Sequence, residues 1–292
     1  MSLENSNEDE ALPDWCAEPC VMGIDEAGRG PVLGAMVYGA AYCRIADKEY
    51  LASQKYDDSK KLSEEKREAL FKLIKSDVQL GWSVDILGPA LLSAMMLRRE
   101  KYNLNAISHD SAMGLIRAAL DRGVNIQEVF VDTVGDANSY QESLSRRFPG
   151  IKFVVCPKAD SIYPIVSAAS IAAKVTRDQA LKDWSFEADL NPIPGREFGS
   201  GYPGDPSTKK WLSEHVESVF GFPSLVRFSW GTTKSLLDAA AVRVEWEAEE
   251  EEEVRGNQKL TFGGVPVAQR VSEASHRHSY FKSRKLQKIL CF

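Results

Sequence analysis

The sequence has few of the residues that mark several protein classes. Its 292 residues include only five cysteines and four histidines. Cysteines that are odd in number and scattered indicate reduced, structural thiols rather than a disulfide framework. Cys16 and Cys20 form the one close pair, but no second pair or flanking histidine gives them the spacing of zinc ligands. The small number and the spacing of the cysteines and histidines exclude a scaffold held together by disulfides and argue against a zinc centre.

Long apolar runs are also missing. No stretch approaches the roughly 18 consecutive apolar residues of a membrane span, and the first 13 residues are acidic, unlike the basic and apolar regions of a signal peptide. No repeat of fixed period occurs, which argues against solenoids and propellers. With 43% hydrophobic and 27% charged residues, the composition is that of an ordinary globular protein. We therefore expect an intracellular soluble protein without membrane contact.

Charge is small in total but unevenly distributed. The formal net charge is −6, yet residues 1–14 hold five acids and no base, and residues 245–253 hold seven glutamates. Residues 254–292 then carry eight Lys or Arg and one acid, whereas the body between these ends is nearly neutral. We expect an acidic disordered leader over residues 1–17. We also expect the acidic run and basic tail over residues 245–292 to be disordered or to dock a partner.

The body alternates short apolar runs with helical patterns. Strands are predicted over residues 20–25, 31–43, 78–87, 129–131 and 152–156, and helices from Ser63, over 89–122 with a break near Asn103, over 139–148 and over 164–186. A glycine turn joins the first two strands into a hairpin. The order predicts an α/β domain over residues 18–190, with a mixed five-stranded sheet flanked by helices. Shorter helices near 206–216 and 232–244, among Pro- and Gly-rich loops, predict a helical C-terminal extension over residues 191–244.

Four acids stand where predicted strands end. Asp25 and Glu26 end the first strand, Asp132 ends the run Val-Phe-Val-Asp, and Asp160 follows the last strand. A carboxylate in such a position is unfavourable unless it is hydrogen-bonded, paired or bound to a metal, although a single Asp there is usually a structural turn residue. The strand ends of an open α/β sheet form the crevice in which ligands bind. The coincidence of four acids therefore favours a shared site.

Such a site is suited to divalent metal ions. Several carboxylates within a few ångströms repel one another near neutral pH, and hard oxygen ligands favour Mg²⁺ or Mn²⁺. Two such ions on shared carboxylates catalyse displacement at phosphorus, one by activating water and the other by stabilising the leaving oxygen. We therefore expect two Mg²⁺ or Mn²⁺ ions and the cleavage of phosphodiesters.

A glycine-rich turn at residues 28–30 follows two of these acids. Adjacent strand residues face opposite ways, so Asp25 and Glu26 serve one site only if the backbone leaves the strand there, which Ala27 and Gly28 allow. The turn loosely matches a dinucleotide-binding fingerprint, but a strand-like run follows instead of a helix, and the two acids would repel a pyrophosphate. A tight hairpin without a ligand is the remaining alternative.

Two further segments have both a functional and a structural interpretation. Tyr202 lies in a Gly-rich loop over residues 199–206, where an aromatic ring can stack on a sugar or base or simply anchor the loop. Lys60 precedes the helix at Ser63 and is either a phosphate ligand or part of a solvated lead-in.

No nucleophilic triad is evident. Cys156 lies in a predicted strand, and His109 and His215 lie on predicted helices, where we interpret them as packing or surface residues. His276 and His278 belong to the tail.

Seven segments, in order along the chain, resemble the type 2 ribonucleases H, and the whole looks like a eukaryotic catalytic A subunit. They read Gly-Ile-Asp-Glu-Ala-Gly-Arg-Gly-Pro-Val-Leu-Gly, Asp-Asp-Ser-Lys-Lys-Leu, Lys-Tyr-Asn-Leu-Asn, Phe-Val-Asp-Thr-Val-Gly, Lys-Ala-Asp-Ser-Ile-Tyr-Pro, Ser-Ala-Ala-Ser-Ile-Ala-Ala-Lys and Gly-Ser-Gly-Tyr-Pro. The resemblance covers residues 20 to about 230. It implies a ribonuclease H-like fold with a helical C-terminal extension.

The resemblance also implies an activity. The enzyme would hydrolyse the RNA strand of RNA–DNA hybrids and incise 5′ of a single ribonucleotide in duplex DNA, leaving 3′-hydroxyl and 5′-phosphate ends. This activity would serve DNA replication and ribonucleotide excision repair in the nucleus. Two accessory subunits would complete a heterotrimer, with the extension as their docking surface.

The resemblance carries over to individual site residues. The family's metal-binding and catalytic acids correspond to Asp25, Glu26, Asp132 and Asp160, with Asp25 bridging the two ions. The segment whose backbone reads the ribose 2′-hydroxyl corresponds to Gly28, Arg29 and Gly30. The tyrosine that contacts that hydroxyl corresponds to Tyr202. Positions near backbone phosphates correspond to Lys60 and Asn103.

Two other functions remain as alternatives. A ribonuclease H-like scaffold would bind nucleic acid or partner subunits without cutting, but it has no reason to keep four uncompensated acids. A resolvase or integrase of the same fold would share the metal site, but the 2′-hydroxyl loop and Tyr202 argue against it.

Overall fold

The computed structural model describes residues 2–5, 12–54, 56, 63–100, 102–187, 190 and 192–243. Lys60, the two tail histidines and the expected tail over residues 245–292 lie outside these residues. No helix in the described part of the chain is long and apolar enough to cross a membrane.

A single mixed sheet organises the fold, with strand order β1-β4-β3-β2-β5-β6. The strands are β1 (Ser2–Asn5), β2 (Cys20–Ala27), β3 (Met36–Arg44), β4 (Gly81–Leu87), β5 (Ile126–Asp132) and β6 (Lys152–Cys156). Strands β2, β3 and β4 pair antiparallel, whereas β2, β5 and β6 pair parallel. The predicted hairpin is confirmed, and the predicted mixed five-stranded sheet corresponds to β2–β6.

The sheet has a sixth strand that the sequence does not indicate. Strand β1 pairs antiparallel with β4 at the sheet edge, and a 3-10 helix, η1 (Asp14–Ala17), buries Cys16. In these two stretches the structure differs from the disordered leader expected over residues 1–17. Edge pairing uses backbone hydrogen bonds, so a polar segment without an apolar pattern can join the sheet.

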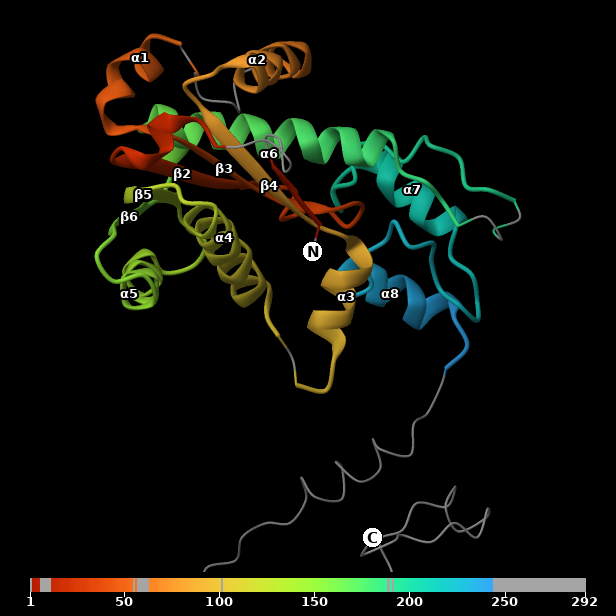
Figure 1. The fold of residues 1–292 in the computed structure, drawn as a ribbon. Helices are drawn as coiled ribbons and strands as arrows, with labels where there is room; N and C mark the ends of the chain where they lie inside the picture. The colour runs from red at the N-terminus through yellow and green to blue at the C-terminus, as the bar shows by residue number, and fades with distance from the viewer. Residues whose placement is uncertain are drawn as a thin grey trace, which may run out of the picture. The chain divides into compact units, whose positions relative to one another are not determined.

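Helices cover both faces of the sheet (Figure 1). One face carries α6 (Pro164–Lys182), with α1 (Lys48–Ser53) and α2 (Glu64–Ser76) packed on α6. The other carries α4 (Leu104–Asp121) and α5 (Ala137–Arg147), and α3 (Pro89–Leu97) contacts α4. Helix α6 can lie close to the sheet because Gly39 has no side chain. A Cβ atom at this position would come within 2.4 Å of the Ala169 carbonyl oxygen.

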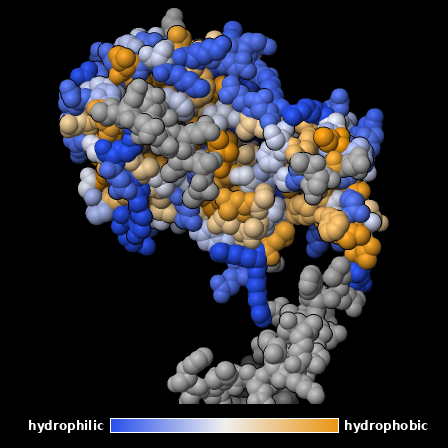
Figure 2. All heavy atoms as spheres, turned by 45° about the vertical axis from the view of Figure 1, so that its right-hand side comes forward, coloured by the Kyte–Doolittle hydropathy of each residue, from blue (hydrophilic) through white to orange (hydrophobic). Residues whose placement is uncertain are grey.

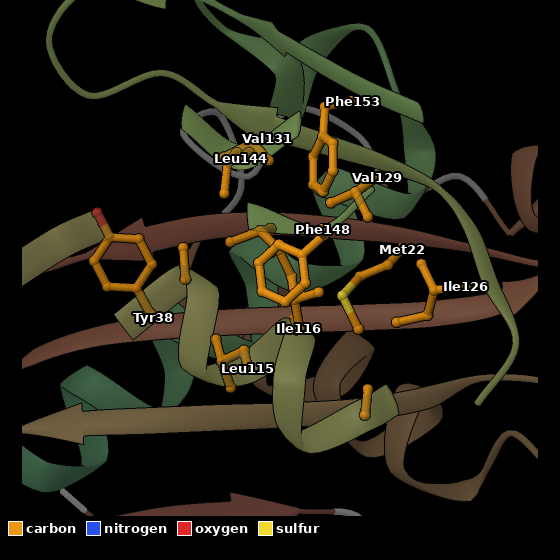
Figure 3. Close-up of a cluster of buried hydrophobic side chains, with 14 of the residues drawn as sticks. Met22, Tyr38, Leu115, Ile116, Ile126, Val129, Val131, Leu144, Phe148 and Phe153 are labelled. Carbon is orange, nitrogen blue, oxygen red and sulfur yellow. The ribbon is translucent and has the colours of Figure 1, made fainter. Parts of the chain in front are cut away.

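Alternate residues of β2 and β3 enter two separate hydrophobic cores. Met22 and Ile24 join the α4–α5 side (Figure 3), whereas Val21 and Val37 join the α6 side. This alternation follows from the two-residue period of a strand. It also decides which face each acid of β2 uses.

The C-terminal extension packs on the rest of the chain. It contains α7 (Pro206–Glu214) and α8 (Gly231–Ala240). Trp211, Leu225 and Val226 form a third core with Val32 and Leu33, which follow the glycine turn. The extension therefore lies against the segment that follows β2.

Candidate active site

Asp25 lies near the end of β2 and is 4% exposed. Its Oδ1 atom accepts a hydrogen bond from the Glu26 backbone N–H at 2.8 Å. Burial raises the pKa of the Asp25 carboxyl, a hydrogen bond from Ser170 of α6 opposes the shift, and the charge of Asp132 adds to it. Lys174, whose Nζ atom lies 2.9 Å from the Ser170 hydroxyl, also favours the ionised form. The carboxylate is thus held at an energetic cost among polar groups of α6.

Asp132 lies beside Asp25 at the carboxyl end of the neighbouring parallel strand. Ile24 pairs with Val131, so the next residue of each strand is an aspartate. Asp132 Oδ1 accepts hydrogen bonds from the backbone N–H groups of Thr133 and Ala159, both at 3.1 Å.

Asp160 is held next to this pair. It lies in the 3-10 helix η3 (Ala159–Ser161) and is 2% exposed. Because its chain neighbour Ala159 donates to Asp132, the crossover loop brings the third acid to the carboxyl ends of β2 and β5. The predicted convergence of these strand ends is therefore found.

The side chain of Glu26 lies on the opposite face of the sheet from that of Asp25. The β2–β3 ladder continues through Glu26 opposite Tyr38 and Ala27 opposite Val37, and the left-handed backbone begins only at Gly28, with φ of 77°. The expectation that the backbone leaves the strand at Asp25 and Glu26 is wrong, because ladder pairing persists two residues further. Glu26 faces the α4–α5 side, where burial raises the pKa of Tyr38 and Tyr140 and the charge of Glu26 adds to the shift.

The chemistry of the donor set fits Mg²⁺ or Mn²⁺. Four carboxylates supply the hard oxygen ligands that these ions prefer, and a bound cation would offset the cost of burying Asp25 beside Asp132. Among the described residues, no three Asp, Glu, His or Cys side chains converge on one point in ligand geometry. The four acids would therefore have to adjust their side chains to ligate a shared ion.

The turn after β2 touches the Tyr202 loop. A Cβ atom on Gly30 would lie 3.3 Å from Tyr202 Cε1, and the Val32 backbone N–H donates to the Gly201 carbonyl oxygen at 2.8 Å. Tyr202 remains 48% exposed. Its ring is thus placed against the glycine turn and is still accessible to a ligand.

Arg29 anchors the turn on the α4 side. Its Nη1 atom donates to the Ser108 hydroxyl at 2.6 Å, and its Nη2 atom donates to the Asn105 side-chain oxygen. The backbone of the turn, rather than the Arg29 side chain, is therefore the part that faces the Tyr202 loop.

A buried arginine that sequence reasoning missed fixes the same turn. Arg227 has no exposed surface, and its guanidinium donates to the carbonyl oxygens of Gly34 (2.8 Å), Arg29 (3.3 Å) and Gly28 (2.6 Å). Burial lowers the pKa of Arg227 to about 9. Trp230 donates from Nε1 to the Gly30 carbonyl oxygen at 3.1 Å. A basic residue within Leu-Val-Arg-Phe, an otherwise apolar run, was the available signal.

The loop that carries Tyr202 has its own supports. Arg177 donates from Nη2 to the Ser200 carbonyl oxygen at 3.2 Å. Asp205 accepts from the Ser200 backbone and hydroxyl and from the Ser207 backbone, and these bonds, led by the Ser200 hydroxyl, lower the pKa of Asp205 to about 2. The loop is therefore fixed from α6 and from the start of α7.

The remaining sequence candidates have structural positions. Asn103 caps α4 by accepting a hydrogen bond from the Ala106 backbone at 2.9 Å, so its phosphate contact stays a prediction. His109 stacks on Tyr140 and His215 on Trp211, which confirms both as packing residues. The element of regular structure that follows the glycine turn is strand β3 and not a helix.

Comparison with known proteins agrees with this geometry. A family model described as Ribonuclease HII matches residues 22–233. The chain belongs to the ribonuclease HII family. As a member it is a ribonuclease H, and this favours the nuclease over the scaffold and the resolvase or integrase. The ribonuclease H2 A subunit of Arabidopsis thaliana is 54% identical, over 98% of this chain and 100% of its own length.

Solved structures support the same family and fold. The crystal structure of the ribonuclease H2 from Pyrococcus horikoshii OT3 has a TM-score of 0.63 and 32% sequence identity, covering 75% of this chain and 98% of that chain. The structure of Bst-RNase HIII in complex with Mn²⁺ has a TM-score of 0.60 at 19% identity, covering 82% of this chain and 73% of that one. The second likeness concerns the fold alone, and it confirms the ribonuclease H-like architecture.

Proposed function

We propose that this ribonuclease H cleaves the RNA strand of RNA–DNA hybrids and incises 5′ of single ribonucleotides in duplex DNA, leaving 3′-hydroxyl and 5′-phosphate ends. The observation that carries the proposal is the contact between the turn at residues 28–30 and the exposed ring of Tyr202, next to the acids that end β2. A ribose 2′-hydroxyl distinguishes RNA from DNA. A turn that tests for it beside the reacting phosphate joins recognition to cleavage at one nucleotide.

The four acids would hold two Mg²⁺ or Mn²⁺ ions. When bound, such ions supply an activated water and stabilise the leaving oxygen at phosphorus. Asp25 and Asp132 would ligate from the α6 face of the sheet and Glu26 from the other face, with Asp25 shared between the ions. Asp160 would complete the set from η3.

The recognition residues act through their backbone and one ring. Gly28, Arg29 and Gly30 would present main-chain groups to the 2′-hydroxyl, since Arg227 and Trp230 already occupy the three carbonyl oxygens of this turn. Tyr202 would contact that hydroxyl and stack on the adjoining deoxyribose. Lys60 and Asn103 would lie near backbone phosphates.

The expected partners are two accessory subunits in a heterotrimer. The relative from Arabidopsis thaliana is itself named as one lettered subunit of ribonuclease H2, which supports a multi-subunit complex. The extension exposes Ile193, Val219, Phe220 and Val242, each more than 60% accessible, and hydrophobic patches interrupt the hydrophilic surface seen in Figure 2. Exposed apolar groups of this kind suit a protein interface. Work on ribonucleotides in genomic DNA would place the complex in the nucleus.

Incision of a duplex with one embedded ribonucleotide tests the proposal. The assay compares the full chain alone with the complex purified from its source, and the lone chain is expected to be weak or inactive. In the complex, Asp25→Asn and Asp132→Asn should abolish cleavage without unfolding the chain. Asp136→Asn is the matched control because Asp136 caps α5 and Asn caps a helix equally well. Full activity in either active-site variant would refute the proposal.

A further inference from the structure

Tyr140 of α5 has a buried hydroxyl that the structure leaves without a partner. The residue is 2% exposed, and among the described residues its Oη atom has no hydrogen-bond partner. A buried hydroxyl without a hydrogen-bond partner destabilises the fold, so packing alone does not explain why this position is a tyrosine.

The carboxylate whose charge acts on Tyr140 is that of Glu26, which lies on the same side of the sheet. The register of β2 and β3 places Glu26 opposite Tyr38, and Tyr38 and Tyr140 belong to the same buried cluster. Figure 3 shows Tyr38 at the end of that cluster with its hydroxyl directed away from the apolar side chains. Burial raises the pKa of both tyrosines, and the charge of Glu26 raises it further.

The ring of Tyr140 is held in a fixed orientation. It stacks on His109 of α4 with ring centroids 3.7 Å apart and planes 9° from parallel. The Nε2 atom of His109 lies 3.4 Å from the carbonyl oxygen of Val134, in the loop that follows Asp132. The stack thus connects the phenol to the end of β5, which carries another of the acids.

The same cluster reaches the glycine turn. Tyr38 and Ser108 are both buried, and Ser108 accepts a hydrogen bond from Arg29 at 2.6 Å. A hydrogen bond thus joins α4 to the glycine turn on the side of the sheet that Glu26 faces.

We propose that Tyr140 is a positioning residue whose hydroxyl donates a hydrogen bond to the Glu26 carboxylate and holds it in the orientation in which it binds a divalent cation. This inference rests on the proposed function, because it assumes that Glu26 is a metal ligand. Such hydrogen bonds orient ligating carboxylates, and their loss typically costs about 10–100-fold in metal affinity.

Direct titration with Mn²⁺ alone tests the proposal on the full chain. Tyr140→Phe should raise the dissociation constant for Mn²⁺ about tenfold or more, while the metal-free variant unfolds at the same temperature as the native chain or a higher one. The matched control is Tyr42→Phe, on the same face of β3 and roughly 13 Å further along the strand from Tyr38. It should bind Mn²⁺ as the native chain does.

Three results would overturn the proposal. Unchanged Mn²⁺ affinity in Tyr140→Phe, with affinity lost in Asp25→Asn, would refute the role of Tyr140 and leave the proposed metal site intact. A metal-free Tyr140→Phe chain that unfolds at a lower temperature would show a structural role instead. If Asp25→Asn also kept its Mn²⁺ affinity, the metal site itself, and the proposed function with it, would be refuted.

Discussion

The Nη2 atom of Arg227 donates a 2.6 Å hydrogen bond to the carbonyl oxygen of Gly28, 199 residues earlier in the chain. Two more bonds from the same guanidinium hold Arg29 and Gly34. The C-terminal extension is therefore part of the architecture of the active site, in addition to any role in docking. A planar guanidinium suits this position because its donors form a rigid fork.

Arg227→Lys should damage the site while keeping the charge. A lysine ammonium carries its three donors on one nitrogen atom and lacks the wide, rigid fork of a guanidinium. At least one of the three buried carbonyl oxygens should therefore lose its partner. We expect the free energy of unfolding to fall by about 1–3 kcal/mol. Displacement of the turn by about 1 Å can cost on the order of 10²-fold in catalysis. Denaturant unfolding and kcat/KM for the single-ribonucleotide duplex measure the two effects.

Arg44→Lys is the control for this substitution. Arg44 forms ion pairs with Glu18 and Asp47 on the surface, at the end of β3 away from the turn. Its replacement should leave kcat/KM unchanged. Native activity in Arg227→Lys would mean that the glycine turn keeps its position without the guanidinium fork.

The acids of the site were predictable because they depend on strand pattern. Asp25 and Asp132 follow apolar runs, and parallel pairing brings such strand ends together. Arg227 and Ser170 were assigned no role because their contacts depend on how the extension and α6 pack, which no local pattern encodes. The opposite orientation of Glu26 follows from the ladder continuing to Ala27, and a glycine-rich sequence does not reveal where that ladder stops.

Strand β1 illustrates a similar limit for the fold. Its four residues, Ser-Leu-Glu-Asn, have no apolar alternation, so their pairing with β4 depends on an available sheet edge. The start of α2 was more predictable. Serine is strongly preferred at the N-cap of a helix, and the Ser63 side chain caps α2.

Gly28→Ala should be far more harmful than an equivalent change elsewhere. Gly28 has φ of 77°, and an added Cβ atom would lie 2.6 Å from the Ala35 carbonyl oxygen. Gly150 has φ of 91° with nothing within 4 Å of the added atom, so Gly150→Ala carries the backbone strain of roughly 1–2 kcal/mol without the clash. We expect incision to be lost only in Gly28→Ala, as measured in the purified complex. Equal activity in the two variants would contradict a close-packed recognition turn.

Tyr202→Ala should affect substrates unequally. The half-exposed ring lies against Gly30, at the turn proposed to read the 2′-hydroxyl. A duplex with one ribonucleotide offers a single such hydroxyl, whereas a long hybrid offers a new one at every position. We expect kcat/KM to fall more on the single-ribonucleotide duplex, and Tyr202→Phe to separate stacking from hydrogen bonding. An equal loss on both substrates would contradict the sensing of the junction by Tyr202.

Asp25→Asn should stabilise the metal-free chain at neutral and alkaline pH. Burial, with a further contribution from Asp132, raises the pKa of Asp25 above its ordinary 3.8 despite the hydrogen bond from Ser170. Between the unfolded and the raised folded pKa, the folded state binds more protons than the unfolded state, so the free energy of unfolding falls as pH rises. A tenfold difference in proton affinity between the two states corresponds to about 1.4 kcal/mol. Asparagine cannot ionise and escapes this loss.

Denaturant unfolding in a chelator from pH 4 to pH 8 measures the effect. The Asn variant should match the native chain near pH 4 and exceed it by pH 8, and parallel profiles would contradict the assigned environment of Asp25. Adding Mn²⁺ at pH 8 should then reverse the order. An ion that binds only the folded state stabilises it by mass action, and the native chain keeps the carboxylate that binds this ion. The buried charge of Asp25 thus destabilises the metal-free chain and is also the group that binds the ion. Binding of the ion neutralises this charge and restores the lost stability.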